Sequence, residues 1–217
     1  MVAPPRCPAK GNPVRAEKAP ARRVTPMQNI ETCCIKVRTG METTMAYTLE
    51  EFCAESHALL KAGPLANALP QIADRLGQLL RNPAFVAESF SDDMPPGRRV
   101  LHHDPETDVY VLAHVQEGKK VGKPHSHGAS WAIYGNARAH TEMTEWCRTN
   151  PESEEHAVLE AASKYRLGPG QTKAYGPGVI HSTAHPEKTW VIRVTGTDLD
   201  ALPRYRFGKK DRMLEQA

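Results

Sequence analysis

Short β-rich runs separated by glycine and proline fill the second half of this chain, and they constrain its fold more than any other feature. The runs are Arg99–His102, Val109–Val115, Trp131–Tyr134, His140–Trp146, Lys164–Leu167, Gly178–His181, Trp190–Val194 and Tyr205–Phe207. Many short strands at this spacing are typical of a closed barrel or a jelly roll. The segment 151–163 interrupts the series, and its composition predicts a helix or a loop.

Two amphipathic helices are predicted ahead of the strands. The run Thr48-Leu49-Glu50-Glu51 has the form of a capping box, which starts a helix, and Gly63-Pro64 ends it. A second apolar stripe recurs at steps of three and four residues and stops near Asn82-Pro83. We therefore expect a helical cap over residues 45–97 that forms one domain with the strands of residues 98–217.

Residues 1–44 differ from the rest in composition and charge. They contain eight Lys and Arg residues against three Glu, are rich in Pro and Ala, and show no hydrophobic period. This composition predicts a disordered basic leader. A start assigned too far upstream is an alternative, because Met41 and Met45 lie just before the first helix; a targeting or nucleic-acid arm is less favoured. The remainder is nearly neutral, so no nucleic-acid partner is expected.

Cysteine usage and hydropathy bear on the compartment. The five cysteines fit neither a zinc site nor a redox pair, and free thiols in a reducing compartment are expected. No apolar run approaches the roughly 20 residues that cross a bilayer, and no secretory signal is visible. We expect a cytoplasmic protein without a membrane partner. No feature of the sequence specifies an oligomeric state.

Three histidines form the candidate metal site. His125 and His127 are two residues apart, so on a strand their imidazoles project from the same face. Alone, such a pair is weak evidence. A second stretch, Tyr175 to His181, is an apolar run that follows a Gly/Pro-rich turn and ends on a histidine. His125, His127 and His181 are therefore the predicted ligands of one divalent metal ion.

Both stretches resemble the two motifs of the cupin superfamily. The first matches the His-x-His start of motif one; in motif two, Gly170, Gly178 and His181 fall in register, while Pro177 is one place late and His185 occupies an Asn position. The resemblance implies a mainly β chain, namely a cupin double-stranded β-helix (jelly-roll barrel) with a helical N-terminal cap.

More narrowly, the segment from about Leu49 to Phe207 resembles the cysteine dioxygenase group of thiol dioxygenases. The matching features are the helical preamble, the His-x-His-Gly-x-Ser-Trp run at 125–131 and the Gly-Thr-Asp-Leu run at 196–199. This group holds iron(II) on three histidines without a carboxylate, and Ala132 stands here where motif one has Glu. The resemblance implies a small-molecule substrate and O₂, and a thiol oxidised to a sulfinate. The alternatives are another cupin oxygenase, an isomerase, or a non-enzymatic metal-binding cupin.

Two positions depart from the thiol dioxygenase pattern. Arg193 and Thr195 occupy the places where the group carries a histidine and a tyrosine that act beside the metal, so they are the candidate catalytic positions. An arginine stays protonated and suits recognition of an anion. Arg193 is therefore a candidate substrate ligand, although an ion pair with Glu142 or Glu145 is an equal alternative.

The remaining candidates are weaker. Arg99 lies about where the group has an arginine that binds a substrate carboxylate, and Tyr175 is a candidate for the rim of the pocket. His114 can point inward, and His140 with Glu142 can add a fourth ligand if their strand enters the cavity. Trp131, Tyr134 and Trp190 are expected to serve in packing, with the alternative that one of them lines the pocket.

Overall fold

The computed structural model describes residues 46–215, apart from 152–153, 155–156, 203 and 208–211. The expected leader, residues 1–44, lies outside the described residues. Three helices come first: α1 (Leu49–Ala62), α2 (Leu65–Leu79) and α3 (Pro83–Ser89). The predicted capping box is confirmed, since Thr48 and Glu51 bond each other's backbone N–H groups. In the part of the chain that is described, no helix is long and apolar enough to cross a membrane.

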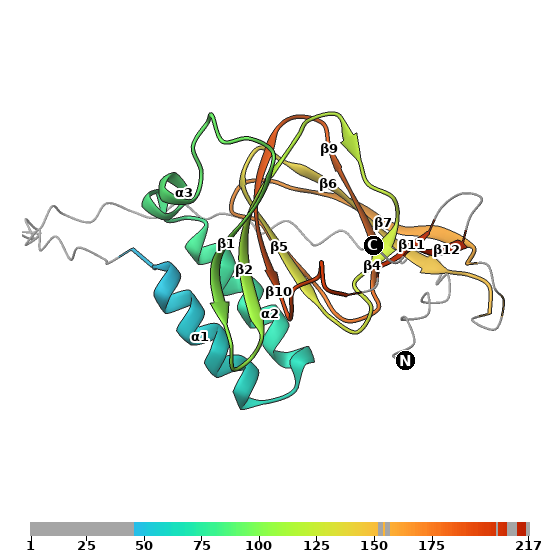
Figure 1. The fold of residues 1–217 in the computed structure, drawn as a ribbon, viewed down its shortest axis with the longest axis horizontal. Helices are drawn as coiled ribbons and strands as arrows, with labels where there is room; N and C mark the ends of the chain where they lie inside the picture. The colour runs from blue at the N-terminus through green and yellow to red at the C-terminus, as the bar shows by residue number, and fades with distance from the viewer. Residues whose placement is uncertain (1–45, 152–153, 155–156, 203, 208–211, 216–217) are drawn as a thin grey trace, which may run out of the picture. The chain divides into compact units, whose positions relative to one another are not determined.

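Two antiparallel sheets follow the helices and face each other (Figure 1). The first has the order β1 (Gly97–Asp104), β2 (Val109–Gln116), β10 (Thr189–Thr195), β5 (Ala132–Arg138) and β8 (Thr172–Tyr175). The second has the order β12 (Arg212–Glu215), β11 (Arg204–Phe207), β4 (His125–Ser126), β9 (Ile180–His185), β6 (Thr141–Arg148) and β7 (Leu159–Leu167), with β3 (Lys120–Val121) beside β9. The eight predicted strands are confirmed, while β3, β4, β8 and β12 were not predicted. The prediction of a helix or a loop over residues 151–163 is partly wrong, because strand β7 begins at Leu159.

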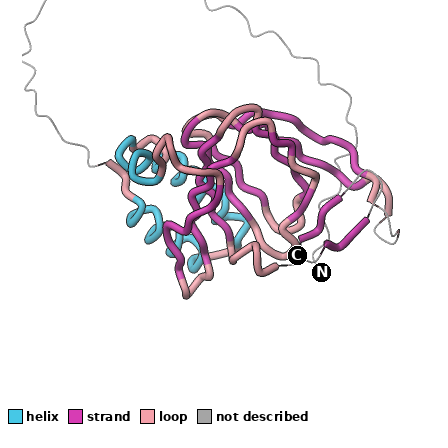
Figure 2. The backbone as a smooth tube through the Cα atoms, turned by 45° about the horizontal axis from the view of Figure 1, so that its top comes forward, coloured by secondary structure: helices cyan, strands magenta, loops and turns pink. Residues whose placement is uncertain are grey.

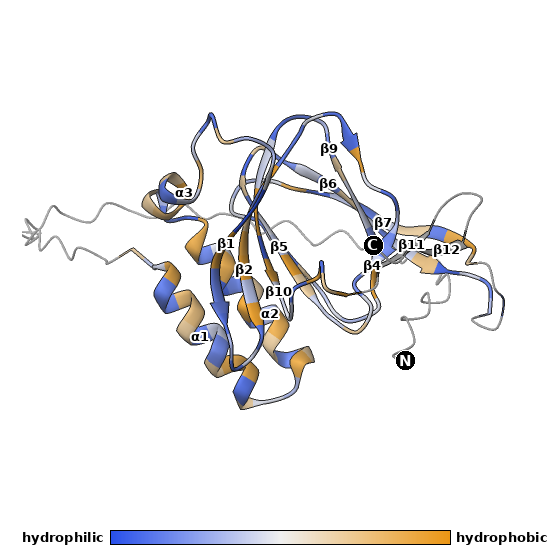
Figure 3. Ribbon diagram, viewed as in Figure 1, coloured by the Kyte–Doolittle hydropathy of each residue, from blue (hydrophilic) through white to orange (hydrophobic). Residues whose placement is uncertain are grey.

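The first sheet has one face toward the helices and one toward the second sheet. Alternate residues of β2, β10 and β5, such as Ala113, Ile192 and Ile133, pack with Phe52 and Leu76 of the helices. The helices lie together on this outer side (Figure 2), and β2 and β10 carry much of the hydrophobic colouring (Figure 3). The opposite face of the same strands is therefore turned toward the space between the sheets.

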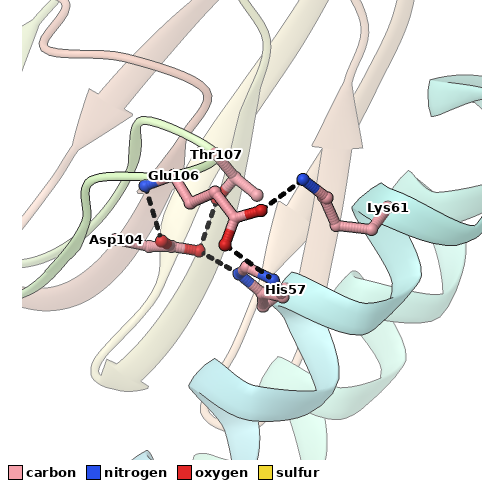
Figure 4. Close-up of polar contacts among 5 residues, drawn as sticks. All are labelled: His57, Lys61, Asp104, Glu106 and Thr107. Atoms are coloured by element: carbon pink, nitrogen blue, oxygen red, sulfur yellow. Dashed lines mark hydrogen bonds and ion pairs between the residues drawn. The ribbon is translucent and has the colours of Figure 1, made fainter.

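A polar cluster joins α1 to the β1–β2 turn (Figure 4). Asp104 accepts hydrogen bonds from Thr107 and from His57 Nδ1, each at 2.6 Å, and Glu106 pairs with Lys61. These hydrogen bonds hold the pKa of the Asp104 carboxyl well below its usual range. The cluster thereby fixes the first helix against the first sheet.

Two cysteines lie among residues whose environment is described. Cys53 is a free thiol, and burial raises its pKa to about 12. Cys147 is disulfide-bonded, so the expectation of free thiols is wrong for that residue.

Gly196 follows β10 and packs directly on the indole of Trp131, which is 6% exposed. A Cβ at this position would lie 2.3 Å from Trp131 Nε1. We expect Gly196→Ala to lower the free energy of unfolding by about 1–3 kcal/mol, because a buried ring must shift. Denaturant unfolding measures this loss. Gly176→Ala is the control, since a Cβ there meets nothing within 4 Å, and equal losses in the two variants would contradict the packing argument.

Candidate metal centre

The three predicted histidines come together between the sheets. His125 of β4 is the direct strand partner of His181 of β9, and His127 follows two residues after His125. One ring nitrogen from each histidine lies within 4.8 Å of the others. His127 and His181 are buried and His125 is partly buried. This spacing suits three imidazoles that converge on one ion at about 2.0–2.1 Å each, so the triad can hold a metal ion.

Backbone carbonyls orient two of the rings. His125 Nδ1 lies 3.0 Å from the Lys123 carbonyl, and His181 Nδ1 lies 3.3 Å from the Val179 carbonyl. Because a carbonyl only accepts, each Nδ1 is the protonated donor, and each Nε2 is the nitrogen that can act as an acceptor or a metal ligand. In metal sites, a ligating histidine usually donates its other ring N–H to such a carbonyl, which fixes the orientation of the ring.

His181 is held in its neutral form. Burial, followed by the charges of His125 and Arg193, lowers its pKa to about 3. A neutral imidazole is the form that binds a metal.

A cavity of about 390 Å³ opens beside the histidines. Its lining residues are His114, Gln116, Lys120, Gly122, Lys123, His125, Tyr134, Thr183, His185, Val191 and Arg193. This lining contains three permanent cations and no carboxylate. Burial, with the charge of Lys120, lowers the pKa of His185 to about 4, so His185 is neutral. The cavity therefore favours an anionic ligand.

Arg193 lies on the cavity face of β10, directly opposite Tyr134 of β5. Its Nε is buried without a hydrogen-bond partner. The alternative pairing with Glu142 or Glu145 is absent among the described residues; Glu145 instead bonds Lys173 and Tyr165. The guanidinium is therefore left to the cavity.

Neither Thr195, predicted as a catalytic residue, nor Tyr175, predicted at the rim of the pocket, is among the residues that line the cavity. Thr195 shares the inner face of β10, but its hydroxyl donates to the Thr197 carbonyl at 2.8 Å and it does not line the cavity. Tyr175 is buried rather than at a rim. Its ring stacks on that of His181 with centroids 4.2 Å apart, and its hydroxyl lies 2.5 Å from that of Tyr165. Tyr175 therefore holds the imidazole of His181 in place by stacking against it.

Arg99 is not brought to the site. It pairs with Ala113, whose side chain faces the helices, and its guanidinium donates to the Ser89 carbonyl at 2.8 Å. The prediction that Arg99 binds the substrate is therefore corrected. Its side chain lies on the helix side of β1 and faces the helical cap, away from the cavity.

Of the other candidate residues, His114 lies at the cavity, whereas His140 and Glu142 do not. His140 pairs with Glu187, and Glu142 is exposed, so neither joins the triad. Tyr134, expected in packing or in the lining of the pocket, lines the cavity and has its hydroxyl 3.4 Å from His127 Nε2 and 3.3 Å from His181 Nε2.

Two facing antiparallel sheets preceded by helices, with this triad between the sheets, define a mainly β fold of the jelly-roll type. No protein-family model matches the sequence, and no curated protein matches it. The structure is similar to that of KdgF from Halomonas sp., at 20% identity and a TM-score of 0.37, over 52% of this chain and 89% of that one.

Two further similar structures are a cupin superfamily protein and a pair of lyases. The first, from Desulfitobacterium hafniense, is 11% identical with a TM-score of 0.38, over 52% of this chain and 87% of that one. The second match, to a structure of the DMSP lyases RdDddP and RnDddQII, has 12% identity and a TM-score of 0.32, over 46% of this chain and 44% of that one. None of these likenesses carries an activity over to this chain.

Proposed function

We propose that this protein is a metal-dependent cupin enzyme that oxidises a small anionic thiol with O₂, using iron(II) held by His125, His127 and His181. The observation that supports the proposal is the convergence of three imidazoles beside a cavity whose described lining contains cations and no carboxylate. Iron(II), when bound, would supply the redox chemistry that O₂ requires.

The donor set fits such an ion. Imidazole suits iron and its neighbours in the divalent series, and three neutral ligands leave the full charge of the ion uncompensated. Ala132, where a carboxylate would otherwise stand, is fully buried and adds no charge. A site of this kind favours a soft anionic ligand such as a thiolate.

The protein's own groups would bind and orient the substrate. Arg193 would receive the anionic end, since its guanidinium faces the cavity without an acidic partner. Lys120 and Lys123 are exposed at the same cavity and would draw anions toward it. His114 and His185 also line the cavity and would be placed to form hydrogen bonds with the ligand.

A different cupin reaction is the second candidate. Because Arg193 and Thr195 replace the proton-handling pair of the thiol dioxygenases, another oxygenase or an isomerase acting on a small anion also fits the cavity. A metal-binding cupin without catalytic activity is the third.

Anaerobic purification, metal analysis and an oxygen electrode separate these candidates. We expect iron near one equivalent, and oxygen uptake with 3-mercaptopropionate, cysteine or mercaptosuccinate that exceeds uptake with cationic cysteamine. Bound iron without oxygen uptake on any of these thiols would contradict the proposed reaction and favour the second candidate. Zinc, or no metal, would favour the non-enzymatic one.

A further inference from the structure

Tyr134 approaches the triad from the opposite sheet. It lies on β5, is 9% exposed, and lines the cavity between its strand partners Arg193 and Lys173. Its hydroxyl is nearly equidistant from Nε2 of His127, at 3.4 Å, and Nε2 of His181, at 3.3 Å. The Tyr134 hydroxyl therefore lies within 3.4 Å of two of the three predicted metal-binding nitrogens.

These distances suit a shared ion better than a hydrogen bond. Hydroxyl hydrogen bonds are usually about 2.5–3.0 Å long, and a phenol has only one proton to give to two nitrogens. In contrast, two ligands placed about 2.0–2.1 Å from one ion at the tetrahedral angle are about 3.3–3.4 Å apart. The Val179 carbonyl directs the lone pair of His181 Nε2 toward the same point.

The charges around the site favour an anionic oxygen there. The described cavity lining offers no Asp, Glu or Cys, and Ala132 supplies no carboxylate. Arg193, whose Nε has no hydrogen-bond partner among the described residues, adds a positive charge opposite Tyr134. The Tyr134 hydroxyl is the oxygen of the described lining that lies within 3.4 Å of two of the three histidines.

We propose that Tyr134 is a fourth ligand of the metal ion and binds it through Oη. This inference rests on the metal site of the proposed function, but not on the thiol reaction. With Tyr134 beside the three histidines, fewer positions on the ion would remain for substrate and O₂. The competing role for Tyr134 is a hydroxyl that bonds the substrate and never touches the metal.

Visible spectroscopy of the full chain loaded with iron and oxidised to iron(III) tests the proposal. We expect a broad phenolate-to-iron charge-transfer band with tyrosine ring modes in resonance Raman spectra. In Tyr134→Phe the band should vanish. The control is Tyr175→Phe, which should keep the band, because that ring stacks on His181 but its hydroxyl bonds Tyr165.

A second substitution covers the case in which Tyr134→Phe fails to fold. Genetic replacement of Tyr134 by 3-fluorotyrosine keeps the shape of the side chain and should shift the energy of the band. An iron-loaded wild-type protein without the band, or a Tyr134→Phe protein that retains it, would overturn the proposal while leaving the triad in place. Absence of iron from the wild-type protein would instead contradict the metal site itself.

Discussion

His181→Ala is expected to abolish metal retention. His181 is fully buried, contributes one of three imidazoles and pairs directly with His125 across β4 and β9. Loss of an outer-sphere partner typically weakens metal binding roughly 10- to 100-fold, and loss of a direct ligand should exceed that. Metal analysis after gel filtration measures the effect, together with any oxygen uptake.

The control for this substitution is His140→Ala. His140 lies outside the triad and pairs with Glu187, so its removal should leave the metal content unchanged. Because His181 also stacks on Tyr175, circular dichroism must show that the variant is folded; His125→Ala, at a less buried position, is the second variant. Unchanged iron in folded His181→Ala would show that the ligand assignment is wrong.

The triad could be predicted because its signals are local. His125 and His127 share a face through the two-residue period of a strand, and the Gly/Pro turn before His181 marks where a third strand begins. The two strands meet at one direct pair, His125 with His181, which no spacing in the sequence specifies. Their juxtaposition was inferred from the resemblance to the cupin motifs.

The sequence predicts Tyr134 as a packing or pocket-lining residue, but not its approach to the histidines, because that placement depends on both sheets. It follows His127 by seven residues, across a turn in which Gly128 adopts a φ of 60°. The two-residue alternation of side chains in a strand does not continue across such a turn, so the face on which Tyr134 lies cannot be predicted from His127. An aromatic residue in an apolar run is most simply interpreted as part of the core. Tyr134 approaches the histidines only because β5, in one sheet, faces β4 and β9, in the other.

Arg99 failed for a related reason. The sequence indicates that Arg98 and Arg99 face opposite sides of a strand, but not which side faces the cavity. The pairing with β2 settles this, since Arg98 lies opposite His114 and Arg99 opposite Ala113. Arg98 is itself engaged by Asp198, at 3.0 Å, and Asp200, at 2.8 Å. Neither arginine is among the residues that line the cavity, so Arg193 remains the candidate for binding an anion there.

Arg193→Met should separate substrate recognition from folding. Hydrogen bonds to a charged group contribute about 1.5–3 kcal/mol, so we expect KM for 3-mercaptopropionate to rise roughly 10- to 150-fold. The KM for cationic cysteamine should not rise. Anaerobic calorimetry with 3-mercaptopropionate should show the same loss in Kd, so that the test does not depend on turnover.

Removal of Arg193 should also raise Tm, because its buried Nε has no partner and methionine carries no charge to desolvate. The matched control is Arg138→Met on β5, whose guanidinium bonds Asp92 and the Phe90 carbonyl outside the cavity. That variant should leave the binding of 3-mercaptopropionate unchanged and should not be stabilised. If Arg193→Met weakens cysteamine and 3-mercaptopropionate equally, or lowers Tm as a structural ion pair would, then Arg193 holds the fold rather than the anion.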